Sequence, residues 1–231
     1  MRFHPRQPRS YGTRRATVQR LAAAALVTIC CLAKCLSPAW ADDPVKIVAF
    51  GDSLTAGYNL PADAAFPARL QAALKAKGIA ATVANAGVSG DTTTGGLSRL
   101  EWSIPEGTQA IILELGANDS LRGVDPKLVK ANLETILSKM QQRHIPVLLA
   151  GMLAPRNLGE DYVQAFDAIY PALAATHPVV FYPFFMDGVI SNPKLLLADG
   201  LHPNPAGVDT IVARILPQVE ELIARIRAGR S

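Results

Sequence analysis

The sequence has few cysteines, and none of them lies in the part that is expected to fold. The 231 residues contain three cysteines, all within the first 41 residues, at Cys30, Cys31 and Cys35. The chain after residue 41 therefore forms no internal disulfide and offers no thiol nucleophile. It has only three histidines and lacks the clusters that bind zinc, so we expect no metal. Such a chain must fold on its apolar core alone.

Positive charge is also scarce once the N-terminal segment is set aside. The whole chain has 23 Lys and Arg against 19 Asp and Glu, but residues 1–41 hold seven of the basic residues and no acidic one. Subtracting these seven from 23 leaves 16 basic against 19 acidic groups, a net charge of −3. The remaining chain therefore lacks the basic excess that nucleic-acid binding requires, and we expect no nucleic-acid partner.

Residues 1–41 have the order of a secretory signal peptide. Two adjacent arginines precede an apolar run over residues 21–36, and the segment ends in Ala39-Trp40-Ala41, with small residues where a signal peptidase needs them. The run is short and contains a lysine, so it spans a bilayer poorly, although a permanent N-terminal anchor is the alternative. We predict that residues 1–41 are a signal peptide, that residues 42–231 form one domain, and that this domain is secreted into the periplasm without stable membrane insertion.

Short β-branched runs alternate with longer amphipathic segments along this domain. Five buried strands are predicted, at residues 45–50, 81–84, 110–113, 147–150 and 179–182. Four helices are predicted from apolar residues at helical spacing, at residues 66–77, 126–143, 161–175 and 205–226. This alternation predicts a three-layer α/β/α fold with a five-stranded parallel sheet, like that of flavodoxin. Ligands bind such sheets at the carboxyl ends of the strands.

A serine follows the first predicted strand, in the string Gly51-Asp52-Ser53-Leu54. At a strand-to-helix turn, a serine hydroxyl lies near the helix N-terminus, where the dipole and free amides favour developing negative charge. The alternative is an ordinary N-cap serine. The string differs from the G-x-S-x-G nucleophile elbow of α/β-hydrolases.

Two further motifs offer uncharged hydrogen-bond donors. Gly87-Val88-Ser89-Gly90 follows the second predicted strand, and a glycine lets a backbone N–H approach a ligand oxygen closely. Leu115-Gly116-Ala117-Asn118 follows the third, and an asparagine amide can hydrogen-bond an oxyanion without reacting. Taken alone, each motif is more typical of an ordinary loop or helix cap.

The fourth motif pairs a carboxylate with an imidazole. Asp199 and His202 are three residues apart, so one short turn can place the carboxylate against one ring nitrogen and leave the other free. The carboxylate would fix the tautomer of the ring and stabilise the imidazolium after proton transfer. The alternative is a capping aspartate beside a surface histidine.

In this chain order, the four motifs resemble the four sequence blocks of the SGNH (GDSL) hydrolase family, over the whole of residues 42–231. The resemblance is closest to the branch of bacterial periplasmic thioesterase I, arylesterase and lysophospholipase enzymes. It is carried by the strings at residues 52–58, 89–92, 114–119, 121–123, 183–186 and 199–203. One departure is Ala117, where this branch often has a second glycine.

The resemblance implies a catalytic role for each motif. Ser53 would be the nucleophile, His202 the general base and later acid, and Asp199 the residue that orients the imidazole. The oxyanion hole would consist of the backbone N–H groups of Ser53 and Gly90 and the side chain of Asn118. No metal or organic cofactor is implied.

Some neighbouring residues have structural or competing interpretations. Gly87 is a rival for Gly90 in the oxyanion hole, although the Ser-Gly-Asp-Thr string favours Gly90. We expect Asp119 to cap the following helix. Glu114 is unexpected in an apolar strand, and we interpret it as a partly buried carboxylate paired with Arg122.

Apolar residues near the predicted site indicate the type of substrate. The segment 153–159 follows the fourth predicted strand, and the resemblance implies that it covers the acyl group. Leu153, Phe184, Phe185 and Met186 could line an acyl channel, although such residues are more often core. These residues favour fatty-acyl or aryl esters over bulky sugars.

The sequence therefore predicts a monomeric serine esterase that acts on a small acyl ester or thioester, including aryl esters and lysophospholipids, through an acyl-enzyme intermediate. Two alternatives stay open. The same residues could serve a carbohydrate O-acetylesterase, or the fold could belong to a catalytically silent protein that binds lipid or glycan.

Overall fold

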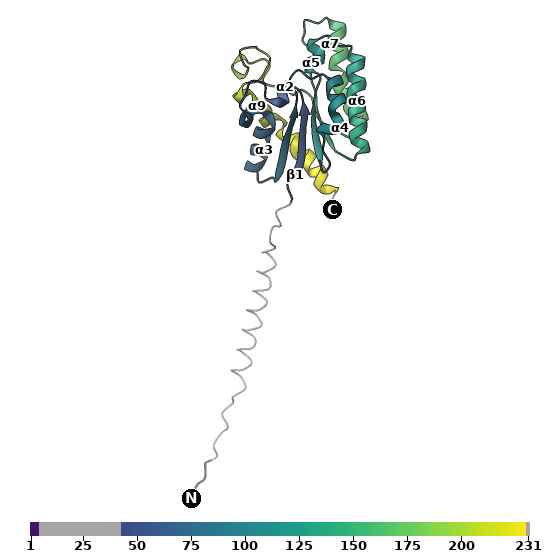
Figure 1. Cartoon of the computed structure of the whole chain (residues 1–231). Coiled ribbons are helices and arrows are strands. Elements are labelled where there is room, and N and C mark those ends of the chain that lie inside the picture. The colour runs from purple at the N-terminus through teal and green to yellow at the C-terminus, as the bar shows by residue number, and fades with distance from the viewer. Residues whose placement is uncertain (5–42, 230–231) are drawn as a thin grey trace. The chain divides into compact units, whose positions relative to one another are not determined.

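The computed structural model describes residues 1–4 and 43–229 (Figure 1). Most of the predicted signal peptide therefore lies outside the described residues. No helix among the described residues is both long and apolar enough to cross a membrane.

Within residues 43–229, a five-stranded parallel sheet forms the centre of the fold. Its strands are β1 (Val45–Gly51), β2 (Ala81–Gly87), β3 (Ala110–Glu114), β4 (Val147–Ala150) and β5 (Val180–Tyr182). They are ordered β2-β1-β3-β4-β5, and every neighbouring pair is parallel. Every residue of β3 and β4 is buried, as expected for strands covered on both faces. This is the flavodoxin strand order, and the predicted fold is confirmed.

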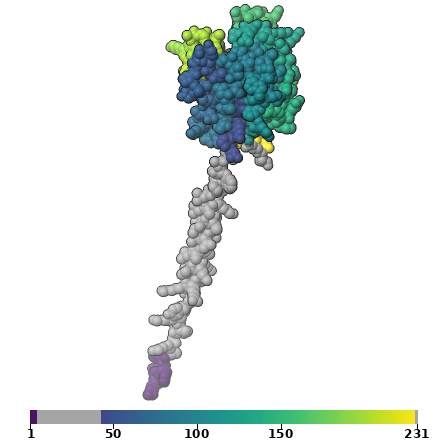
Figure 2. Space-filling model, viewed as in Figure 1, coloured from purple at the N-terminus to yellow at the C-terminus, as the bar shows by residue number. Residues whose placement is uncertain are grey.

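Helices cover both faces of the sheet. Its helices are α2 (Ser53–Ala56), η1 (Ala62–Ala64), α3 (Phe66–Ala76), α4 (Thr93–Ser103), α5 (Ala117–Leu121), α6 (Pro126–Gln142), α7 (Glu160–Asp167), α8 (Ile169–Thr176), η2 (Pro193–Leu195) and α9 (Pro205–Ala228). α3 packs with α9, whereas α4 packs with α6, and Figure 1 shows these two pairs on opposite sides of the sheet. In the space-filling view, the side chains of the helical layers close over most of the sheet (Figure 2).

Two helical segments differ from the sequence prediction. The single helix predicted over residues 161–175 is two helices, α7 and α8, which meet at Ala168. Pro171 lacks an N–H to donate to the carbonyl of Asp167, so one continuous helix is interrupted there. The sequence prediction also missed α4, whose first turn contains Gly95 and Gly96 and has little apolar periodicity.

The strand order brings three motifs to one edge of the sheet. Gly51 at the end of β1 pairs in register with Gly87 of β2 on one side and with Glu114 of β3 on the other. The residues that follow these three strand ends therefore lie side by side. The chain changes direction across the sheet between β1 and β3, which is where open α/β sheets bind their ligands.

Candidate active site

Ser53 lies in a tight turn between β1 and α2. Asp52 caps α2, since its Oδ1 accepts a hydrogen bond of 2.9 Å from the Leu54 N–H. Gly51 is required just before the turn, because a Cβ there would lie 2.2 Å from the Thr55 hydroxyl oxygen. The turn places Ser53 as the first residue of α2, with 7% of its surface exposed.

The Ser53 hydroxyl meets the His202 ring, although the two residues are 149 positions apart in the sequence. The distance from Ser53 Oγ to His202 Nε2 is 3.0 Å. On the other side of the ring, His202 Nδ1 lies 2.7 Å from Asp199 Oδ2. These distances form a continuous chain from hydroxyl to imidazole to carboxylate, in which the carboxylate can fix the ring tautomer and the ring can take the hydroxyl proton.

The turn that carries Asp199 also keeps its side chain ionised. Asp199 Oδ1 accepts hydrogen bonds from the backbone N–H groups of His202, at 3.0 Å, and Leu201, at 2.9 Å. These two backbone bonds, helped by the His202 ring, lower the pKa of Asp199 to about 2. Asp199 is therefore a carboxylate wherever His202 would act as a base.

An aromatic ring supports the imidazole from one side. The rings of Tyr58 and His202 have centroids 4.4 Å apart and are tilted by 35°. This contact restricts the orientation of the imidazole in addition to the bond from Asp199. Sequence analysis gave Tyr58 no role of its own, and the available signal was that it ends the string 52–58 that resembles the family.

Donors for an oxyanion lie at the ends of β1, β2 and β3. As the first residue of α2, Ser53 has an N–H that precedes the intrahelical hydrogen bonds. Asn118 lies in the first turn of α5, and its Nδ2 donates one hydrogen to Asp52 Oδ2 at 3.0 Å. The second hydrogen of this Nδ2 remains available, because a side-chain amide carries two.

The two rival glycines after β2 differ in what their N–H groups do. The Gly87 N–H donates to Asn85 Oδ1 at 3.0 Å, so it is occupied within its own loop. Gly90 has a positive φ of 82°, which favours glycine, and no partner for its N–H occurs in the described part of the chain. The local geometry therefore favours Gly90 over Gly87 as an oxyanion donor.

The predicted pairing of Glu114 with Arg122 is wrong. Glu114 is fully buried, and its Oε2 accepts bonds from the Thr55 hydroxyl at 2.7 Å and the Asp52 N–H at 3.3 Å. Arg122 instead donates to the Gly90 carbonyl at 2.9 Å. Without a cation, burial and then the neighbouring Asp52 raise the pKa of Glu114 well above its usual value. The fold therefore favours the protonated form of Glu114.

The expectation that Asp119 caps the following helix is also wrong. Asp119 lies inside α5, is fully buried, and accepts bonds from the Thr93 N–H at 2.8 Å and the Thr93 hydroxyl at 2.7 Å. It thereby ties the start of α4 to α5. The cap of α6 is Asp125, whose Oδ1 accepts from the Lys127 N–H at 2.9 Å.

A cavity of about 450 Å³ opens beside Ser53 and His202. Its apolar lining includes Leu121, Met152, Leu153, Phe184, Met186 and Ile190. The segment after β4 contributes five consecutive residues, 152–156, so the first four residues of the predicted segment 153–159 line the cavity. Phe185, however, is fully buried and packs edge-on against Phe66 with centroids 5.0 Å apart, so it belongs to the core and does not line the cavity. An apolar cavity of this size can hold an acyl chain.

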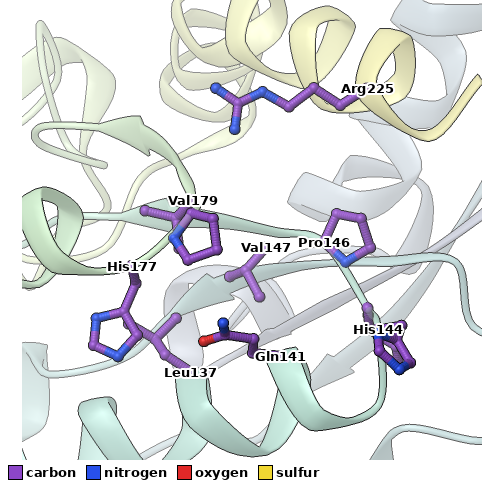
Figure 3. A pocket seen from close by; sticks show the side chains of 10 residues that line it. Leu137, Gln141, His144, Pro146, Val147, His177, Val179 and Arg225 are labelled. Carbon is purple, nitrogen blue, oxygen red and sulfur yellow. The ribbon is translucent and has the colours of Figure 1, made fainter. Parts of the chain in front are cut away.

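A second cavity, of about 430 Å³, lies at the opposite end of the sheet (Figure 3). It is lined at the amino ends of β4 and β5 by residues 145–147 and 177–179, with Arg225 of α9 above them. Ser53 follows the carboxyl end of β1, so this cavity is remote from it. Among the described residues there is also no group of three or more His, Cys, Asp or Glu side chains that could hold a metal ion.

Comparison with known proteins agrees with this geometry. The sequence model of the GDSL-like Lipase/Acylhydrolase family matches residues 49–209. The chain is 41% identical over 172 residues to the arylesterase of Vibrio mimicus, covering 74% of this chain and 86% of that enzyme. It is 37% identical over 178 residues to thioesterase 1/protease 1/lysophospholipase L1 of Escherichia coli strain K12, covering 77% and 84% respectively. The crystal structure of TesA superposes with a TM-score of 0.73 at 35% identity, covering 77% of this chain and 99% of TesA.

Proposed function

Because the chain belongs to the GDSL-like lipase/acylhydrolase family, we propose that Ser53 is the nucleophile of a serine esterase. The family and the named relatives make the protein a carboxylic ester hydrolase. The observation that carries the assignment of Ser53 is its 3.0 Å contact with His202, whose other nitrogen lies 2.7 Å from Asp199.

The first half of the reaction acylates the serine. Ser53 Oγ attacks the carbonyl carbon of the substrate while His202 Nε2 takes the hydroxyl proton, since serine is a weak nucleophile without a base. The carbonyl double bond opens, and its oxygen becomes an oxyanion. When the tetrahedral intermediate collapses, His202 gives its proton to the departing alkoxide or thiolate, which leaves as alcohol or thiol. Asp199 stabilises the imidazolium that exists between these two transfers.

The second half releases the acid. A water molecule gives a proton to His202 and attacks the acyl carbon, and the second tetrahedral intermediate collapses to return that proton to Ser53 Oγ. In both halves the oxyanion receives hydrogen bonds from the Ser53 and Gly90 N–H groups and from the Asn118 amide. These bonds are stronger in the transition state than in the ground state, and this difference accelerates the reaction.

The lining of the cavity indicates that the enzyme recognises its substrate mainly through an acyl chain. Eleven of the residues that line the space beside Ser53 are apolar, and Arg156 is its only lining residue with a permanent charge. The relatives are named as an arylesterase and as a thioesterase and lysophospholipase. We therefore propose aryl esters, fatty-acyl thioesters and lysophospholipids as substrates of this chain. We also propose that residues 1–41 direct a monomeric enzyme to the periplasm.

An acyl-chain series tests the substrate class. Purified enzyme lacking residues 1–41 is assayed with p-nitrophenyl acetate, butyrate and octanoate, and then with acetylated xylan. We expect kcat/KM to be highest above acetate, with no acetate released from xylan and no activity above background in Ser53→Ala. A preference for acetate together with release from xylan would instead favour the carbohydrate O-acetylesterase.

A further inference from the structure

Two buried carboxyl groups lie directly behind Ser53 and take no part in the proton relay. Asp52 and Glu114 are both 0% exposed, and within the described residues neither forms an ion pair with Lys or Arg. Burying two acids side by side is costly, since each loses its hydration and each disfavours ionisation of the other. Core packing alone does not explain why two carboxyl groups are buried here.

The contacts of Asp52 connect it to the oxyanion hole. Its Oδ1 caps the helix that begins with Ser53, and its Oδ2 accepts a bond of 3.0 Å from Asn118 Nδ2. An ionised carboxylate can only accept hydrogen bonds. It therefore requires that Asn118 present its NH₂ end, and not its carbonyl oxygen, toward Asp52 and the neighbouring space.

The orientation of this amide decides whether Asn118 helps or hinders the reaction. The terminal torsion of asparagine is broad and roughly two-fold, so the side chain alone does not distinguish its two orientations. With the NH₂ group held by Asp52, the second hydrogen of the same nitrogen is free for the oxyanion. With the amide reversed, the carbonyl oxygen of Asn118 would face the oxyanion and repel it.

Glu114 holds the backbone of Asp52 and the side chain of Thr55 by hydrogen bonds. Its Oε2 accepts from the Asp52 N–H at 3.3 Å and from the Thr55 hydroxyl at 2.7 Å, so it holds both sides of the turn around Ser53. Burial, and then the negative charge of Asp52, raise the pKa of Glu114 well above its usual value, so ionisation of Asp52 disfavours ionisation of Glu114. Asp52 is also the member of the pair that touches Asn118.

We propose that Asp52 is a positioning residue for the transition state, which fixes the Asn118 amide with its NH₂ group toward the oxyanion. The proposal rests on the proposed function and adds to it a residue that touches neither the substrate nor the proton relay. Asp52 acts only through Asn118, so its effect on the reaction depends on Asn118 being present.

A double-mutant cycle tests this dependence. Asp52→Asn keeps the size of the side chain and a good N-cap, but it replaces an acceptor-only group with one that also carries NH₂ donors. We expect Asp52→Asn to lower kcat by about 10–100-fold, below the full loss typical of one oxyanion donor, with KM changed less than about threefold. In the Asn118→Ala background, the fold-loss of kcat caused by Asp52→Asn should be less than a third of the fold-loss that it causes in the wild type.

Controls separate positioning from general damage. Asp125→Asn makes the same substitution at the N-cap of another helix, α6, where Asp125 accepts from the Lys127 N–H, and it should leave kcat unchanged. If Asp52→Asn does not fold, Asp52→Ser replaces it in the cycle, because serine also caps helices but is too short to reach Asn118. Folding is checked by the thermal midpoint.

Either outcome decides the proposal. A smaller effect of the Asp52 variant in the Asn118→Ala background, together with an unchanged KM, supports it. Equal factors in both backgrounds, or a wild-type effect below about threefold in kcat, would overturn it. Failure of the proposed function is distinguishable, because it would show as an inactive wild-type enzyme before any variant is made.

Discussion

Three carboxyl groups around Ser53 carry different charges for reasons that are local to each residue. Asp199 is accessible and accepts two backbone N–H bonds, which lower its pKa to about 2. Burial raises the pKa of Asp52 to about 6 and raises that of Glu114 well above its usual value. The carboxylate that orients His202 therefore lies in an exposed turn, whereas the carboxyl group whose protonated form is favoured is buried.

The buried pair should make stability depend on pH in an unusual direction. Because the folded-state pKa of Glu114 exceeds the unfolded value of about 4.3, the folded state binds more protons between these two values. The stability that protonated Glu114 contributes is thus lost as pH rises through its folded-state pKa. The contribution of Asp52 is lost in the same way as pH rises from its ordinary pKa of 3.8 to its folded-state pKa of about 6. Asp91 and His202 also act on Asp52, the former raising and the latter lowering its pKa. Glu114→Gln should lose less stability than wild type between pH 5 and pH 8, measured by urea midpoints.

A matched control distinguishes the buried group from glutamates in general. Glu106 is exposed, so Glu106→Gln should follow the wild-type pH dependence. Parallel curves for Glu114→Gln and wild type would contradict a raised pKa of Glu114 in the folded state.

Among the elements, α4 holds the strand ends that carry the site. Arg99 of α4 donates to the Gly51 carbonyl at the end of β1, at 2.8 Å, and to the Ala86 carbonyl near the end of β2, at 2.9 Å. It also pairs with Asp91 at 2.6 Å and lies 4.1 Å above the ring of Phe50. One side chain thus fixes the ends of two strands and the loop that contains Gly90.

Removing this contact should destabilise the protein strongly. The side chains of Arg99 and Asp91 are only 7% and 12% exposed, so Arg99→Met leaves a nearly buried carboxylate without its cation. We expect a loss of about 3–5 kcal/mol in the free energy of unfolding, the range seen when one partner of a buried pair is removed. Urea unfolding of Arg99→Met and wild type measures this difference.

An exposed ion pair serves as the control for the buried pair of Arg99 and Asp91. Arg69 and Asp209 are 41% and 57% exposed, and Arg69→Met should cost at most about 1 kcal/mol. A similar small cost for Arg99→Met would show that α4 does not hold the strand ends through this residue.

Local patterns predicted most of the elements but not all of them. β3 and β4 were predicted because short, wholly apolar runs are typical of strands buried on both faces. α4 was missed because its stability comes from Arg99, from the Asp119 bonds to Thr93 and from the Thr92 cap rather than from an apolar stripe. The contacts of Arg99 and Asp119 join segments whose proximity only the folded chain creates, whereas the Thr92 cap is local, with its hydroxyl accepting from the Gly95 N–H.

At the scale of the whole molecule, the strand order brings the separate motifs of the site together. Placing β1 between β2 and β3 brings Ser53, Gly90 and Asn118 to one edge of the sheet. The rule that ligands bind at the carboxyl ends of parallel strands predicted this edge from the sequence. The contacts of Asp52 with Asn118, of Glu114 with Thr55 and of Tyr58 with His202 were not predictable, because they depend on side-chain directions across separate segments.

The central claim is that His202 activates Ser53 as a nucleophile, and covalent labelling tests it most directly. The enzyme lacking residues 1–41 is treated with a fluorophosphonate, which reacts with activated serines, and the modified peptide is identified by mass spectrometry. The account predicts one adduct per chain, on Ser53, no adduct in Ser53→Ala, and labelling slowed by about 10³-fold or more in His202→Ala. Absence of an adduct on Ser53 in the wild type, or equally fast labelling without His202, would contradict it.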